Sequence, residues 1–249
     1  MGSIWSTQLD YVYFFYGLAF LLLGAVCLSI REQGPQPLPW TLLGLFGFFH
    51  GLAEWLDLAA LVLDLGGLGW WGALRLVVMT LSFALLVEFG RRGLVIHGQL
   101  RAGAWIVLPP LLAVTAAAVA VDLPTAGGLA RYLLALPGCF ASAAVLAGHS
   151  QRVEGGRGLW LRVAAGVFLL YGLVSGAVVP VSSLPPSHWL NTDSVQALLG
   201  LPVQVLRGAL AVAAAVALWC YEIERTERAD QRRKLRHHFW ITFLALLVV

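Results

Sequence analysis

The sequence predicts an all-α polytopic membrane protein, a bundle of seven transmembrane helices with the N-terminus outside. Of its 249 residues, 59% are hydrophobic and only 12% are charged, whereas soluble domains carry about 25% charged residues. Apolar runs of about 20 residues recur along the whole chain, and each is long enough to cross a hydrocarbon core of about 30 Å. The composition, with a mean hydropathy of +0.82, therefore excludes an ordinary soluble domain.

The seven expected spans can be placed in order along the chain. The first run lacks a preceding basic region and is too long for a signal peptide, so it is expected to be a true span. The expected spans are residues 9–30, 40–63, 68–89, 104–121, 129–149, 160–181 and 195–221. Short connections with Gly and Pro pairs indicate antiparallel neighbours. Pro109, Pro110 and Pro137 are expected to kink the fourth and fifth spans.

The basic residues predict the orientation of the bundle. All but three of the 16 Lys and Arg residues lie in alternate connections and after the seventh span, and the N-terminus and the other connections hold none. The positive-inside rule then places the N-terminus in the periplasm and the stretch after the seventh span in the cytoplasm. The net charge of +3 reflects these flanking arginines, so no nucleic-acid partner is expected. The arginine-rich, lysine-poor composition suggests a bacterial inner membrane.

The C-terminal part divides into two further segments. Residues 1–221 form the expected membrane domain, and residues 222–238 form a charged cytoplasmic linker. Glu224/Arg228 and Asp230/Lys234 in this linker have the i,i+4 spacing that supports an exposed helix, which would extend the seventh span. Residues 239–249 are apolar but would cover only about 16 Å as a helix. They are expected to be the truncated start of an eighth span or an interfacial helix.

Ionisable side chains inside the spans are the candidates for a functional site. Each costs about 2.5–3.5 kcal/mol at the centre of a span and so needs a reason. His50, Glu54 and Asp57 share one face of the second span because they are spaced by four and three residues. By depth, Arg207 is expected to pair with Glu54 or His50, and Arg75 with Asp57. The expected ligand-binding or sensing residues are His50, Glu54, Asp57, Arg75, Arg207 and Tyr16.

Two interpretations of this cluster remain open. In one, the charges are satisfied pairs that fix helix packing. In the other, they line a pocket that binds or senses a small or lipophilic ligand. No catalytic residue, metal site or cofactor is expected, because the three cysteines lie singly, the only lysine, Lys234, is outside the spans, and no Walker or HExxH motif occurs. An enzymatic activity of this chain is therefore left undecided.

Three stretches resemble a known class of module. LDYVYFFYGLAFLLLGAVCL, FGFFHGLAEWLDL and the charged WCYEIERTER after the seventh span together resemble the N-terminal multi-span sensory modules of bacterial sensor histidine kinases and diguanylate cyclases. The resemblance implies that further sensing and output domains, such as a kinase or cyclase, follow in a longer chain. It also implies a homodimer, for which Gly172 and Gly176 offer a small-residue face.

The function expected on these grounds is signal sensing within the membrane, as the sensory module of a histidine kinase. The signal would enter through the second, third and seventh spans and leave by movement of the seventh. A small secondary transporter that uses Glu54 and Arg207 is the alternative, and a structural membrane anchor is a further one.

Overall fold

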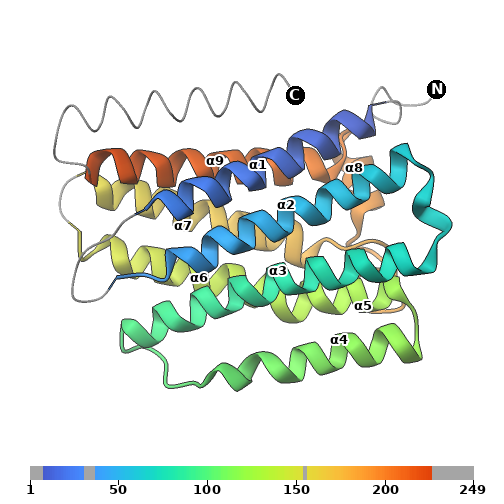
Figure 1. Cartoon of the computed structure of the whole chain (residues 1–249), viewed down its shortest axis with the longest axis horizontal. Coiled ribbons are helices and arrows are strands. Elements are labelled where there is room, and N and C mark those ends of the chain that lie inside the picture. The colour runs from blue at the N-terminus through green and yellow to red at the C-terminus, as the bar shows by residue number, and fades with distance from the viewer. Residues whose placement is uncertain (1–7, 31–36, 154–155, 226–249) are drawn as a thin grey trace.

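A computed structural model describes residues 8–30, 37–153 and 156–225, and these residues form an all-helical bundle (Figure 1). The α-helices are α1 (Leu9–Ser29), α2 (Trp40–Val62), α3 (Gly69–Ile96), α4 (Leu108–Ala120), α5 (Leu123–Ala130), α6 (Leu136–Ser150), α7 (Arg157–Tyr171), α8 (Thr192–Leu199) and α9 (Val203–Arg225). The short segments are the 3₁₀ turns η2 (Leu65–Gly67) and η3 (Ala104–Val107) and the π-helical segments η4 (Arg131–Ala135) and η5 (Gly172–Ala177). The predicted all-α class is confirmed for the described part of the chain.

Six helical segments in the described residues are long and apolar enough to cross a membrane. They are α1, α2, α3, the continuous helix Leu123–Ser150, the continuous helix Arg157–Ala177, and α9. The expected fourth span corresponds to Ala104–Ala120, which is shorter than these six. It packs mainly on α5 at the edge of the bundle (Figure 1), and only Val114 and Ala117 of α4 are buried.

The expected seventh span, 195–221, is wrong as one helix, because the chain breaks it into α8 and α9. Asn191 caps the start of α8 with a capping box, and Gly200 ends it in a left-handed conformation with φ 71°. Pro202 immediately precedes α9, where its missing N–H costs no helical hydrogen bond. Arg207 therefore lies only one turn into α9. The helix runs past Tyr221 to Arg225, and the rest of the expected linker and residues 239–249 lie outside the described residues.

Pro109 and Pro110 do not lie in a helix interior as expected, because they occupy the first turn of α4. The first turn of a helix has N–H groups without helical partners, so proline is tolerated there. Pro137 lies inside the continuous helix Leu123–Ser150, directly after the π-helical segment η4. The fifth span also begins earlier than expected, at Leu123, where the Asp122 carboxylate accepts a hydrogen bond from the Thr125 N–H.

Glycines allow α1 and α2 to pack closely. A Cβ atom at Gly47 would lie 2.7 Å from the Phe20 carbonyl oxygen and from the Gly24 nitrogen. Gly172 and Gly176 similarly allow η5 to pack closely on α6. A Cβ atom at Gly172 would lie 2.8 Å from Cys139, and one at Gly176 would lie 2.8 Å from Leu136. The expectation that these two glycines form a dimer face is therefore wrong, because both are buried against α6 and the end of η4.

The two ends of the bundle differ in charge. The α3–α4 and α6–α7 connections lie at one end (Figure 1), which carries Arg101 and Arg152. We call this the basic end. The α2–α3 and α4–α5 connections lie at the other end, which carries Asp64 and Asp122. We call this the acidic end, and no Lys or Arg occurs in its described connections.

Candidate functional site

His50 lies at the centre of the bundle on α2 and is fully buried. Its Nδ1 atom is 3.0 Å from the Ser82 hydroxyl oxygen of α3. That hydroxyl donates its hydrogen to the Met79 carbonyl at 2.7 Å, so its oxygen can only accept from the imidazole. Nδ1 therefore carries a hydrogen, and Nε2 of the neutral ring is an acceptor.

A chain of hydrogen bonds leads to this Nε2 atom from the other side of the bundle. The Arg131 Nη1 donates to the Ser175 hydroxyl at 3.2 Å, and Ser175 donates to the Tyr171 hydroxyl at 3.1 Å. The Tyr171 hydroxyl, at 2.9 Å from His50 Nε2, then has its hydrogen available for the ring. The Tyr16 hydroxyl lies alongside, 3.3 Å from that of Tyr171 and 3.5 Å from Nε2. All five side chains are buried. We use the term polar network for these five and two neighbours, namely Tyr16, His50, Glu54, Ser82, Arg131, Tyr171 and Ser175.

Glu54 lies one turn from His50 and completes the polar network. Its Oε1 is 3.6 Å from His50 Nε2, and only 4% of the residue is exposed. The expected ion pair between Glu54 and Arg207 is wrong, because it is absent from the ion pairs of the described residues. The guanidinium of Arg207 is instead engaged with backbone carbonyl groups.

Arg207 and Arg131 both serve the end of η5. Arg207 donates to the Val174 carbonyl at 3.0 Å and to the Val178 carbonyl at 2.6 Å, and it is 3% exposed. Arg131 donates to the Ser175 carbonyl at 3.2 Å. The last turn of a helix leaves carbonyl groups without helical partners and carries the negative end of its dipole. Two buried arginines therefore supply hydrogen-bond donors to this helix end from within the protein.

Asp57 and Arg75 form the expected ion pair beside the polar network. Both lie nearer the acidic end than Glu54, and the side chain of Asp57 is 21% exposed while that of Arg75 is 45% exposed. This prediction is confirmed. The pair is therefore a partly solvated one, in contrast to the fully buried groups one turn deeper.

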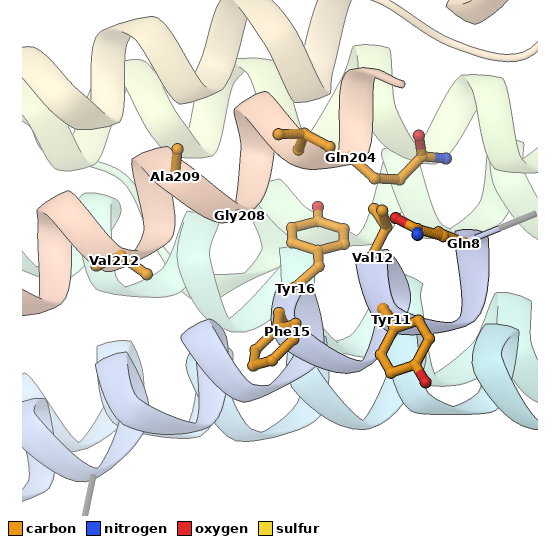
Figure 2. A pocket seen from close by; sticks show the side chains of 10 residues that line it. Gln8, Tyr11, Val12, Phe15, Tyr16, Gln204, Gly208, Ala209 and Val212 are labelled. Atoms are coloured by element: carbon orange, nitrogen blue, oxygen red, sulfur yellow. The ribbon is translucent and has the colours of Figure 1, made fainter. Parts of the chain in front are cut away.

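A groove runs between α1 and α9 next to the polar network (Figure 2). Its volume is about 340 Å³. Figure 2 shows the ring of Tyr16 between the two helices, with Gln8 and Gln204 toward one end and Val212 toward the other. Its lining residues are Gln8, Tyr11, Val12, Phe15, Tyr16, Gln204, Val205, Gly208, Ala209 and Val212. Tyr16 is thus shared between the groove and the polar network.

The structure brings together part of the expected site. Tyr16, His50 and Glu54 converge, whereas Arg207 faces the end of η5 and Arg75 binds Asp57 at the edge. Sequence reasoning did not select Arg131, although an arginine within a span is subject to the same cost as Arg207. Tyr171, Ser82 and Ser175 gave no such signal, because uncharged hydroxyl groups are common in membrane helices.

No group of three or more His, Cys, Asp or Glu side chains in the described residues could hold a metal ion. The groups of the polar network, an imidazole, a carboxyl group and several hydroxyl groups, can bind and transfer protons and rearrange their hydrogen bonds. Comparison with protein-family models, curated proteins and solved structures found no match to this chain.

Proposed function

We propose that this chain is the membrane-embedded sensory module of a bacterial signal-transduction protein, such as a sensor histidine kinase or diguanylate cyclase. In this proposal it lies in the inner membrane with its N-terminus in the periplasm and α9 as its output element. The observation that carries the proposal is the polar network, which joins α1, α2, α3, η4, α7 and η5, together with the Arg207 contact that ties α9 to the same region. A state change in the network would therefore act on the helix that leads toward the charged segment after Arg225.

Two polar contacts tie α9 to this region. Arg207 holds α9 to the end of η5, and Gln204 donates to the Tyr13 hydroxyl of α1 at 3.2 Å. The helices α1 and α9 pack against each other, and the groove opens along one side of this seam. Such a seam permits a second arrangement of α9, and a signal shifts the balance between two arrangements only if it favours one of them.

The two alternatives make different demands on the same residues. A transporter that uses Glu54 and Arg207 at its substrate site loses its main support, because these side chains do not pair. A structural anchor requires a satisfied network but a single position of α9. The expected homodimer of a sensory module would need a face other than Gly172 and Gly176.

The experiment that tests the proposal measures the position of α9 in the full chain reconstituted in liposomes. Spin labels are attached to Cys220 on α9 and to Leu28→Cys on α1, with Cys27 and Cys139 replaced by Ala. The sensory proposal predicts two label separations. Ala209→Phe, which fills the groove, should shift the population toward one of them, because it removes the space beside α9.

The matched control is Val216→Phe, because Val216 is exposed on the same helix but lies outside the groove. It should leave the two populations unchanged. One separation in the parent protein, unchanged by Ala209→Phe, would favour the structural anchor and contradict the proposal.

A further inference from the structure

We propose that His50 and Glu54 form a proton-binding site that is filled from the acidic end of the bundle. This inference deepens the proposed sensory function, on which its consequence for α9 rests, by naming the proton as the ligand. It starts from the position of the Glu54 carboxyl group. Its Oε1 atom lies 3.6 Å from His50 Nε2, its side chain is only 5% exposed, and in the tautomer fixed by Ser82 this nitrogen already accepts from the Tyr171 hydroxyl. A buried carboxylate beside a neutral imidazole is costly unless a proton binds to one of the two groups.

The path to this site follows one face of α2. Asp57, Glu54 and His50 are spaced by three and four residues, which stacks them about one turn apart. Asp57 lies five residues before the end of α2, about 8 Å along the helix, and its side chain is 21% exposed. Glu54 is 5% exposed at its side chain and His50 is not exposed. The carboxylates thus form a graded route from the acidic end to the imidazole.

The opposite side of His50 is closed. The rings of Phe20, Phe46 and Phe83 pack around the imidazole with centroid separations of 4.4, 5.4 and 5.0 Å. All three rings are buried, as are Leu43 and Leu86 toward the basic end. Aromatic and aliphatic side chains offer no proton acceptors, so the proposed route to His50 runs from the side of Glu54, and the Tyr171 and Tyr16 hydroxyls are the other polar groups at Nε2.

The bound proton changes the direction of the neighbouring hydrogen bonds. A proton that moves from water to Nε2 makes that atom a donor, so the Tyr171 hydroxyl must accept from it and turn its own hydrogen away. Ser175 already donates to Tyr171, which leaves the Tyr16 hydroxyl, 3.3 Å away, as the acceptor for that hydrogen. Tyr16 lies directly against Gly208 of α9. Binding of the proton therefore changes the hydrogen bond of Tyr16, the residue shared between the polar network and the groove.

The charges around the site act in both directions. The titratable and charged groups that surround it are Tyr13 and Tyr16 of α1, Glu54 and Asp57 of α2, Arg75 of α3, Arg131 of η4, Cys139 of α6, Tyr171 of α7 and Arg207 of α9. The positive charges of Arg131 and Arg207 oppose uptake of a proton, whereas burial of the Glu54 carboxylate and the charge of Asp57 favour it. Replacing Arg207 by Met should therefore raise the proton affinity of the pair.

The test is a pH titration of the full chain in liposomes with two spectroscopic readouts. Infrared absorption reports a protonated carboxyl group, and ¹⁵N NMR of labelled histidine reports whether Nε2 is an acceptor or carries hydrogen. We expect at least one of these two signals to change with pH. The infrared signal should disappear in Glu54→Gln and the ¹⁵N signal in His50→Gln. Both should persist in the control Glu88→Gln, which lies near the basic end. Glu54→Asp, which keeps a carboxyl group, should restore titration with a shifted infrared band if Glu54→Gln fails to fold.

A second variant tests the hydrogen-bond chain. Tyr171→Phe keeps the ring but removes the donor to neutral Nε2, so the proton affinity of the pair should rise roughly fivefold. In the same variant the populations of α9 should no longer respond to pH. A purely structural role of Tyr171 would lower stability and leave the titration midpoint where it was.

Sidedness is tested with oriented vesicles, whose orientation is read by labelling Gly66→Cys in the exposed α2–α3 turn with a membrane-impermeant maleimide. A pH step at the acidic end should change the signal, and a step at the basic end should not. The proposal is overturned if neither signal titrates while the protein stays folded, or if only the basic end controls it. If the signal titrates while α9 keeps a single position, the proton site stands and the sensory function fails. If α9 takes two positions but neither signal titrates, the sensory function stands and the proton site fails.

Discussion

Arg207→Met should destabilise the protein more than any similar change at a surface arginine. The substitution keeps an unbranched side chain of similar length but removes three N–H contacts to the Val174 and Val178 carbonyls, at 3.2, 3.0 and 2.6 Å. A buried carbonyl left without a donor costs about 1–3 kcal/mol. Part of this loss is offset because a buried cation no longer has to be desolvated. We therefore expect the free energy of unfolding to fall by roughly 2–4 kcal/mol.

The assay is reversible unfolding in mixed micelles, with Arg92→Met as the matched control. The Arg92 side chain is 55% exposed, and its partner Glu88 also pairs with Arg91, so this control should change stability by no more than about 0.5 kcal/mol. Arg207→Lys should fall between the two, because one ammonium keeps the charge at the helix end without the fork of the guanidinium. Equal stability of Arg207→Met and Arg92→Met would refute the assignment of Arg207 to the end of η5.

Three further predictions follow from single contacts. Gly47→Ala should cost about 1–3 kcal/mol in unfolding experiments because its Cβ would meet backbone atoms of α1, whereas the control Gly166→Ala, with nothing within 4 Å of its Cβ, should not destabilise. A double-mutant cycle on Asp57 and Arg75 should give a coupling of only about 0.2–1 kcal/mol that weakens with salt, since both side chains are partly exposed; a coupling of several kcal/mol would contradict this. The hydrogen bond from the Thr125 N–H lowers the pKa of the Asp122 carboxyl. The stabilisation of α5 by the Asp122 carboxylate is therefore present above the ordinary Asp pKa and is lost as the pH falls through the lowered value. Amide hydrogen exchange of α5 should show this loss in the parent protein and not in Asp122→Asn.

The sequence predicted the features that depend on composition and on one helix at a time. Apolar runs located the six helical segments that are long and apolar enough to cross a membrane, although the ends of several differ from those expected and the expected fourth span is shorter. The face shared by His50, Glu54 and Asp57 followed from helical spacing alone. The Asp57–Arg75 pair followed because both residues lie at similar depth on helices joined by a short turn.

The misplaced features depend on local breaks and on tertiary contacts. Gly200 and Pro202 divide the expected seventh span, so Arg207 lies one turn into α9 and contacts the Val174 and Val178 carbonyls. The expected depth of Arg207 was therefore wrong, because it assumed one unbroken helix over residues 195–221. Tyr171 and Ser175 are brought to His50 by the packing of α7 against the centre of the bundle, which no spacing within α7 could reveal.

The fate of the buried charges shows how the two interpretations of the site can be separated. Two arginines and one glutamate are buried near the centre, and direct pairing of Glu54 with an arginine would have settled all of them as packing contacts. The structure instead commits both arginines to carbonyl groups at the end of η5 and leaves Glu54 beside a neutral imidazole. A double-mutant cycle between Glu54→Gln and Arg207→Met should then give a coupling of no more than about 1 kcal/mol, because the two side chains act on each other through their charges without a direct contact. A coupling of several kcal/mol would restore the ion pair and remove the reason to treat Glu54 as a proton carrier. A weak coupling would mean that Arg207 is not the direct counter-ion of Glu54, as the proton-binding proposal requires.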